Sequence, residues 1–207
     1  MIKAIFFDVD GVLVDSFEAN AAWFKEMFET TGYIAPTKEE YRHMFHIALD
    51  DMIRLVAKPD AKEFKRVREI SKRIPFPFEK MKLTKGAEET LKKLAKKYKL
   101  AIVTGRDEHG VEELLTFYDL KKYFDIVVHY GHYENPKPHP EPLLKALERL
   151  EIHPNEAVYV GDQKTDFESA KAAKIPFILH SEYDYKLKGV KLIAKKFTDI
   201  PALIGKI

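Results

Sequence analysis

The stretch AIFFDVDGVLVDS, residues 4–16, decides the fold. Residues 2–7 are almost all apolar and rich in β-branched and aromatic side chains, which predicts a strand buried on both faces, as inside a parallel sheet. Asp8 and Asp10 follow at its carboxyl end, where open α/β sheets bind ligands, and Gly11 permits a turn. Two carboxylates this close together are electrostatically costly unless a cation or a reaction uses them.

A plainer interpretation is that Asp8 and Asp10 are turn formers, because Asp often ends a strand by hydrogen-bonding to nearby backbone. A turn requires one Asp and a Gly. It gives no reason for the full pattern Asp-x-Asp-Gly-x-Leu-x-Asp-Ser after a buried strand, so this pattern favours a functional site.

Length and composition limit the possible classes of protein. A chain of 207 residues with 45% hydrophobic residues has room for one sizeable core and an accessory lobe. Its 35 basic and 33 acidic residues nearly cancel, and a net charge of +2 does not favour nucleic acid as the main partner. The chain has no cysteine, an N-terminal strand in place of a signal segment, and no apolar run long enough to cross a membrane. We therefore expect a cytoplasmic protein without a membrane partner.

The region after Ser16 changes from strand to amphipathic helix. Apolar residues at helical spacing predict helices over residues 17–32, 37–55 and 60–74, and the Pro75 to Phe78 segment ends the last of them. These helices form an all-helical insertion, so we expect two domains. One comprises residues 1–16 and 81–207, and the other comprises residues 17–80.

Helices and strands alternate in the rest of the chain. Strands are predicted over residues 100–104, 126–128, 157–161 and 176–179, with helices between them and a last short helix over residues 198–204. This alternation predicts the α/β class, with a doubly wound, Rossmann-like parallel sheet and helices on both faces.

Functional side chains follow several of these strands. Thr104 and Gly105 end one strand, Lys137 lies in the proline-rich loop after the next, and Asp162 and Asp166 follow a third. Because the carboxyl ends of parallel strands share one edge, we expect these residues to meet Asp8 and Asp10 in one crevice.

The set of side chains suits a particular chemistry. Several carboxylates without thiolates suit Mg²⁺, while a lysine and a threonine nearby suit a phosphoryl group. Taken singly, Thr104 could be an ordinary strand residue, Lys137 a surface lysine, and the two later aspartates a helix cap and a first-turn charge. Their joint occurrence, each after a strand, favours the site.

These residues resemble the four motifs of the haloacid dehalogenase superfamily, specifically its phosphatase branch with a helical cap inserted after the first motif. The first motif is the Asp-x-Asp stretch described above, and Thr104 with Gly105 resembles the second. Lys137 resembles the third motif, and Gly161-Asp162 with Asp166 resembles the fourth. The resemblance covers almost the whole chain and extends to phosphoglycolate phosphatases and β-phosphoglucomutases.

The resemblance implies a role for each motif residue. Asp8 would attack phosphorus, and Asp10 would donate a proton to the leaving alcohol and later take one from water. Mg²⁺ would be held by the Asp8 carboxylate, the Asp10 carbonyl and Asp162, with Asp166 in support. Thr104, with Gly105, and Lys137 would hold the phosphoryl oxygens.

Three functions agree with these features. The first is a Mg²⁺-dependent phosphomonoester hydrolase that acts on a small phosphorylated metabolite. A sugar phosphomutase would keep the same motifs and return the phosphoryl group to its substrate. A non-enzymatic phospho-accepting module would also use an Asp pair and Mg²⁺, although such a module needs no lid. The sequence leaves the natural substrate and the oligomeric state open.

Overall fold

The computed structural model describes residues 1–44, 47, 49–181 and 187–207. The chain divides into two compact units, one of residues 1–15 and 83–207 and the other of residues 16–82. A short two-stranded sheet of β2 (Val14–Asp15) and β3 (Lys82–Leu83) lies where the chain leaves and re-enters the first unit. No described helix has both the length and the apolar character needed to span a bilayer.

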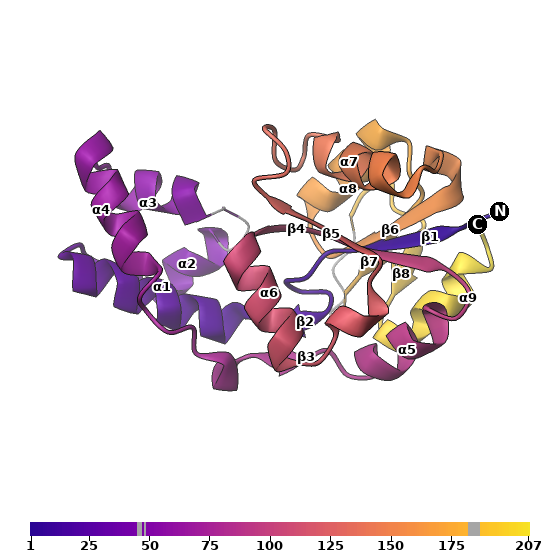
Figure 1. Ribbon diagram of the computed structural model, residues 1–207, viewed down its shortest axis with the longest axis horizontal. Coiled ribbons are helices and arrows are strands. Elements are labelled where there is room, and N and C mark those ends of the chain that lie inside the picture. Colours follow the sequence, from indigo (N-terminus) through magenta and orange to yellow (C-terminus); the bar gives the residue numbers. More distant parts are fainter. Residues whose placement is uncertain (45–46, 48, 182–186) are drawn as a thin grey trace. The chain divides into compact units, whose positions relative to one another are not determined.

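The first unit is built on a parallel sheet of six strands (Figure 1). The strands are, in spatial order, β5 (Ile126–Tyr130), β4 (Lys99–Asp107), β1 (Ala4–Phe7), β6 (Ala157–Gly161), β7 (Phe177–His180) and β8 (Leu192–Ala194). The central strand β1 pairs with β4 on one side and β6 on the other, and its four residues are fully buried. This arrangement confirms the predicted fold class, since continuous apolar strands are typical of a parallel sheet covered on both faces.

Helices cover both faces of this sheet (Figure 1). Helices α7 (Glu141–Leu150) and α8 (Lys164–Ala173) lie over one face, where Phe6 and Tyr159 belong to the same buried cluster as the apolar side of α7. The other face is covered by α5 (Ala87–Leu94), α6 (Glu108–Phe117) and α9 (Ile200–Ile204). There Phe7 stacks on Phe197 with ring centroids 5.7 Å apart. Alternate β1 side chains thus point to opposite layers, as the period of a strand requires.

The second unit is helical. Its helices are α1 (Phe17–Thr31), α2 (Lys38–Met44), α3 (Leu49–Ala57) and α4 (Ala61–Ser71). Their apolar faces form a separate core that includes Phe28, Met52 and Val67. The start of α4 is capped by Asp60, whose side chain accepts the N–H of Glu63 at 2.8 Å. The use of this unit as a cap over the site stays a prediction.

The sequence prediction was wrong about one helix, and it missed three short strands, β2, β3 and β8. The single helix predicted over residues 37–55 ends as α2 at Met44, because the N–H of Ile47 bonds to the Met44 carbonyl in a turn rather than continuing the helical ladder. Residues 45, 46 and 48 of that predicted helix lie outside the described part of the chain. The edge strand β8 was missed, since three residues are too few for a clear alternation of apolar and polar side chains.

Candidate active site

The loop after β1 turns sharply within a few residues. The N–H of Asp8 still bonds to the Val160 carbonyl of β6 at 2.9 Å, so the Asp8 side chain leaves the sheet at the carboxyl edge. The carbonyl of Val9 then accepts the N–H groups of Leu13 and Val14, at 2.8 and 3.1 Å. Gly11 has φ of +78° in this turn, a conformation that favours glycine. The loop therefore holds Asp8 against the centre of the sheet.

Glycine at position 11 also makes room for a carboxylate from another strand. A Cβ on Gly11 would overlap the Asp162 carboxyl group, with the carboxyl carbon only 2.5 Å away. Gly161 has a similar function, because a Cβ there would lie 2.5 Å from the Cβ of Asp166. Gly11 thus allows Asp162 to approach the loop after β1, and Gly161 allows Asp166 to approach the end of β6.

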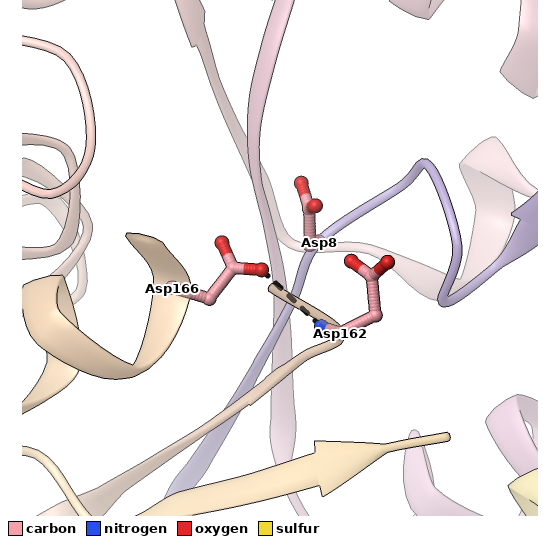
Figure 2. Close-up of side chains that lie close together, drawn as sticks. All are labelled: Asp8, Asp162 and Asp166. Carbon is pink, nitrogen blue, oxygen red and sulfur yellow. Dashed lines mark hydrogen bonds between the residues drawn. The ribbon is translucent and has the colours of Figure 1, made fainter. Parts of the chain in front are cut away.

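Asp8, Asp162 and Asp166 form the acidic cluster of this site (Figure 2). Each offers a carboxylate oxygen, and these oxygens lie within 4.8 Å of one another. Burial raises the pKa of Asp8 to about 7, with further increases from the charges of Asp166 and Asp10, while Lys137 acts to lower it. Burial, followed by the charges of Asp166 and Asp8, also raises the pKa of Asp162 well above its usual value. The cluster therefore concentrates negative charge in a place that water screens poorly.

The donor set of the acidic cluster fits a hard divalent cation. Asp162 Oδ2 accepts a hydrogen bond from the Gln163 side chain at 2.6 Å, whereas the buried Oδ1 has no hydrogen-bond partner among the described residues. A buried carboxylate oxygen without a partner carries a large desolvation cost that a bound cation would relieve. Oxygen atoms of carboxylates are the ligands that Mg²⁺ prefers in proteins.

Asp166 is already engaged by the protein itself. Its Oδ1 accepts hydrogen bonds from Lys137 Nζ at 2.6 Å and from the Tyr159 hydroxyl at 2.9 Å. Its Oδ2 accepts the N–H groups of Asp162 and Gln163 at 3.2 and 3.0 Å (Figure 2 shows the first). A carboxylate has about four acceptor positions, and four donors occupy them here. Asp166 is thus placed to hold its neighbours in position.

Lys137 links the acidic cluster to the proline-rich loop before α7. Its Nζ lies 3.1 Å from Asp8 Oδ1 and 2.6 Å from Asp166 Oδ1. Burial acts to lower the pKa of Lys137, but the charges of Asp166 and Asp8 raise it well above its usual value. Glu141, the first residue of α7, fixes this loop by accepting the N–H groups of Glu134 and Asn135, each at 3.0 Å. The lysine is therefore charged and held beside the carboxylate of Asp8.

Asp10 takes a different position from the acidic cluster. Both of its carboxylate oxygens accept hydrogen bonds from Arg106, from Nε at 2.8 Å and from Nη2 at 2.7 Å. This two-point pair is partly buried, with 11% of the Arg106 side chain and 25% of the Asp10 side chain exposed. Arg106 was not predicted from the sequence, although it stands two residues after Thr104 in the strand that neighbours β1.

Thr104 and Gly105 lie on β4 at the same edge of the sheet as Asp8. The Thr104 hydroxyl is buried and accepts the N–H of Arg106 at 3.2 Å, and the Thr104 carbonyl accepts the Tyr133 hydroxyl at 3.0 Å. Gly105 is exposed. Thus Asp8, Lys137 and the two later aspartates come into direct contact, whereas these two β4 residues share the edge without a described hydrogen bond to the acidic cluster.

The fold and this edge define the class of protein. A Rossmann-like parallel sheet with acidic side chains at the carboxyl ends of its central strands is a ligand-binding α/β fold. Residues 5–180 match the model of the haloacid dehalogenase-like hydrolases. The chain belongs to this family, and the resemblance inferred from the motifs is confirmed.

The chain is similar to proteins with more specific names. It is 33% identical over 195 residues to a phosphorylated carbohydrates phosphatase of Thermotoga maritima, a match that covers 89% of each chain. It is 40% identical over 92 residues to the phosphoglycolate phosphatase of Escherichia coli K12, covering 44% of this chain and 36% of that protein. A solved structure from Thermotoga maritima, assigned as a beta-phosphoglucomutase, is 29% identical, covers both chains fully and has a TM-score of 0.74. The predicted enzyme class, a phosphatase of this family, agrees with the names of the curated relatives.

Proposed function

We propose that this protein is a Mg²⁺-dependent phosphomonoester hydrolase that acts on a small phosphorylated metabolite through an aspartyl-phosphate on Asp8. The observation that carries the proposal is the contact of 3.1 Å between Lys137 Nζ and Asp8 Oδ1 within the acidic cluster. A nucleophilic carboxylate and a phosphoryl dianion repel each other, and a charged lysine between them offsets that repulsion. Membership of the hydrolase family supports the same chemistry.

The reaction would proceed in two displacements at phosphorus. In the first, an Asp8 oxygen forms a bond to phosphorus, the bond from phosphorus to the substrate oxygen breaks, and Asp10 gives its proton to the leaving alkoxide. In the second, Asp10 takes a proton from water, the water oxygen bonds to phosphorus, and the acyl-phosphate bond breaks. Inorganic phosphate is released, and the Asp8 carboxylate and the protonated Asp10 are regenerated.

Arg106 gives Asp10 a defined orientation in this scheme. The two hydrogen bonds from its guanidinium hold the Asp10 carboxylate in a fixed orientation. Asp10 must release at least one of these hydrogen bonds when it exchanges a proton with substrate or water. We therefore assign Arg106 a positioning role for Asp10.

Asp8 and Asp162 are the residues proposed to hold Mg²⁺, together with the main-chain carbonyl of Asp10. The buried Asp162 Oδ1 without a described partner supports this assignment. Asp166 would act by orienting Lys137 and the Asp162 main chain, because its own acceptor positions are filled. Mg²⁺ would supply positive charge that lowers the repulsion between Asp8 and the phosphoryl group.

Thr104, Gly105 and Lys137 are the residues proposed to bind the phosphoryl oxygens. The Lys137 ammonium, which lies beside Asp8, would donate a hydrogen bond to a phosphoryl oxygen, and the Thr104 hydroxyl would be an uncharged hydrogen-bond donor. Their common location at the carboxyl edge of the sheet supports this proposal, since β4 is the direct neighbour of β1.

A phosphomutase is the second candidate, because the chain also resembles a solved structure assigned as a beta-phosphoglucomutase. The residues of the two reactions are the same, and the difference lies in the acceptor of the phosphoryl group. We favour hydrolysis because the curated relative that matches across 89% of its own length is named a phosphatase. That name makes phosphorylated carbohydrates the first substrates to examine.

The proposal is tested by measuring phosphate release from a panel of phosphorylated sugars and short hydroxy acids, with Mg²⁺ and with a chelator. We expect Mg²⁺-dependent release that Asp8→Asn abolishes and that Asp51→Asn, which alters an exposed aspartate on α3, retains. Conversion of a hexose 1-phosphate to the 6-phosphate without free phosphate would instead establish the mutase. Equal release by wild type and Asp8→Asn would refute both enzymes.

A further inference from the structure

Tyr159 places a hydroxyl group in the middle of the core. It lies on β6, the neighbour of β1, is fully buried, and packs on Phe177 with ring centroids 6.0 Å apart. A phenylalanine would fill almost the same volume without bringing a polar atom into an apolar layer. A buried hydroxyl is costly unless it is hydrogen-bonded, so its partners indicate what it is for.

The partners of that hydroxyl are two charged residues of the site. Tyr159 Oη lies 3.0 Å from Lys137 Nζ and 2.9 Å from Asp166 Oδ1, with the Val103 carbonyl more distant at 3.4 Å. An ammonium group cannot accept a hydrogen bond, so Lys137 donates to the Tyr159 oxygen. The hydroxyl proton of Tyr159 is then directed to Asp166. Lysine, tyrosine and aspartate thus form a closed triangle of hydrogen bonds.

The triangle determines in which direction the Lys137 ammonium can donate its remaining hydrogen bond. An ammonium group carries three protons, and Lys137 donates hydrogen bonds to Tyr159 Oη and Asp166 Oδ1, while Asp8 Oδ1 is its ion-pair partner at 3.1 Å. Because Tyr159 and Asp166 accept two of the protons, the third is left for Asp8 or for a phosphoryl oxygen beside it. Without the hydroxyl, one proton of a buried ammonium would lose its acceptor, and the ammonium could rotate about the end of its flexible side chain.

We infer that Tyr159 is a positioning residue that, with Asp166, aims the Lys137 ammonium at Asp8 and at the phosphoryl group that Asp8 receives. The inference rests on the proposed function for its kinetic consequence. The triangle itself is independent of that function, because it consists of three hydrogen bonds between side chains of the structure. In the sequence, Tyr159 stands two residues before the Gly161-Asp162 pair.

The test compares Tyr159→Phe with Tyr33→Phe. Tyr33 is a matched control, because its hydroxyl also donates to a carboxylate, that of Glu63 at 3.2 Å, but in the helical unit. We expect Tyr159→Phe to lower kcat/KM by about tenfold and to weaken binding of inorganic phosphate, measured by calorimetry with Mg²⁺, by a similar factor. Tyr33→Phe should stay within about twofold of wild type in both. Circular dichroism verifies that each variant is folded.

A second comparison separates positioning from a general effect on the core. In a Lys137→Ala background, Tyr159→Phe should change phosphate binding by less than about twofold, because the group it orients is gone. An undiminished effect in that background would overturn the inference, as would wild-type values for Tyr159→Phe. A wild-type protein that binds phosphate but hydrolyses no phosphomonoester would refute the proposed function alone, and the binding comparison would still decide the role of Tyr159.

Discussion

Replacing Asp8 by Asn should make the pH dependence of stability visibly different from that of the wild type. Burial raises the pKa of Asp8 from 3.8 to about 7, so between these values the folded chain holds a proton that the unfolded chain has lost. The wild type is therefore stabilised by Asp8 at low pH and loses this contribution as the pH rises towards 7. Asparagine has no such proton to lose.

The magnitude follows from the shift in pKa. Linkage gives about 1.4 kcal/mol for each pH unit, and the folded carboxyl group keeps its proton over roughly two units between pH 5 and 7, where the unfolded group is ionised. The unfolding free energy of Asp8→Asn relative to wild type should thus rise by about 3 kcal/mol from pH 5 to pH 8. For a domain of this size, that change in relative free energy shifts the Tm difference between the two proteins by roughly 5–10 °C.

The assay is thermal or urea unfolding of both proteins at pH 5 and pH 8 in buffer with a chelator, so that no divalent cation compensates the charge. Asp51→Asn removes an exposed aspartate and gives the baseline for the change. A gap between wild type and Asp8→Asn that stays constant with pH, or that moves in the opposite direction, would refute our account of the buried acidic cluster.

Three further predictions concern the cation site and the ion pair between Asp10 and Arg106. Mg²⁺ should raise the Tm of the wild type more at pH 8 than at pH 5, because protons compete for a cluster in which two carboxyl pKa values are raised; an equal shift at both would contradict the site. Gly11→Ala should remove most of this Mg²⁺ effect, because the added Cβ would overlap Asp162 of the acidic cluster. Gly32→Ala is its control and should keep the effect, because Gly32 also has a positive φ, +86°, and so the same backbone strain of about 1 kcal/mol, but has open space around it. Arg106→Ala should lower kcat by roughly tenfold or more, with partial recovery in Arg106→Lys, as Asp10 loses its two-point support. The surface variant Arg149→Ala is the control, and an Arg106→Ala enzyme as active as that control would show that the pair has no catalytic consequence.

The parts of the fold that could be predicted are those with strong local patterns. The apolar run before Asp8 indicated a buried parallel strand, and the helix start predicted at residue 37 is present, with Glu40 accepting the Thr37 N–H at 2.8 Å. The break after Met44 and the edge strand Leu192–Ala194 depend on tertiary context, which a pattern of apolar residues does not contain.

The site shows the same division. Asp8, Lys137 and Asp162 were predicted to converge because each follows a strand of one parallel sheet. Arg106 and Tyr159 could not be predicted in this way, since their roles depend on which side chain lies opposite them across neighbouring strands. A tyrosine within an otherwise apolar strand was the available signal for one, and an arginine two residues after Thr104 for the other.

The most direct measurement of the central claim is the identity of the phosphorylated residue. Wild-type protein is mixed with its best substrate and Mg²⁺, quenched in acid, reduced with borohydride and digested, and its peptides are sequenced by mass spectrometry. Because borohydride reduces an acyl phosphate to an alcohol, we predict homoserine at position 8 in a fraction of the wild-type chains and unmodified asparagine in Asp8→Asn. Phosphate release by a wild-type enzyme that carries the modification at another residue, or at none, would contradict the account.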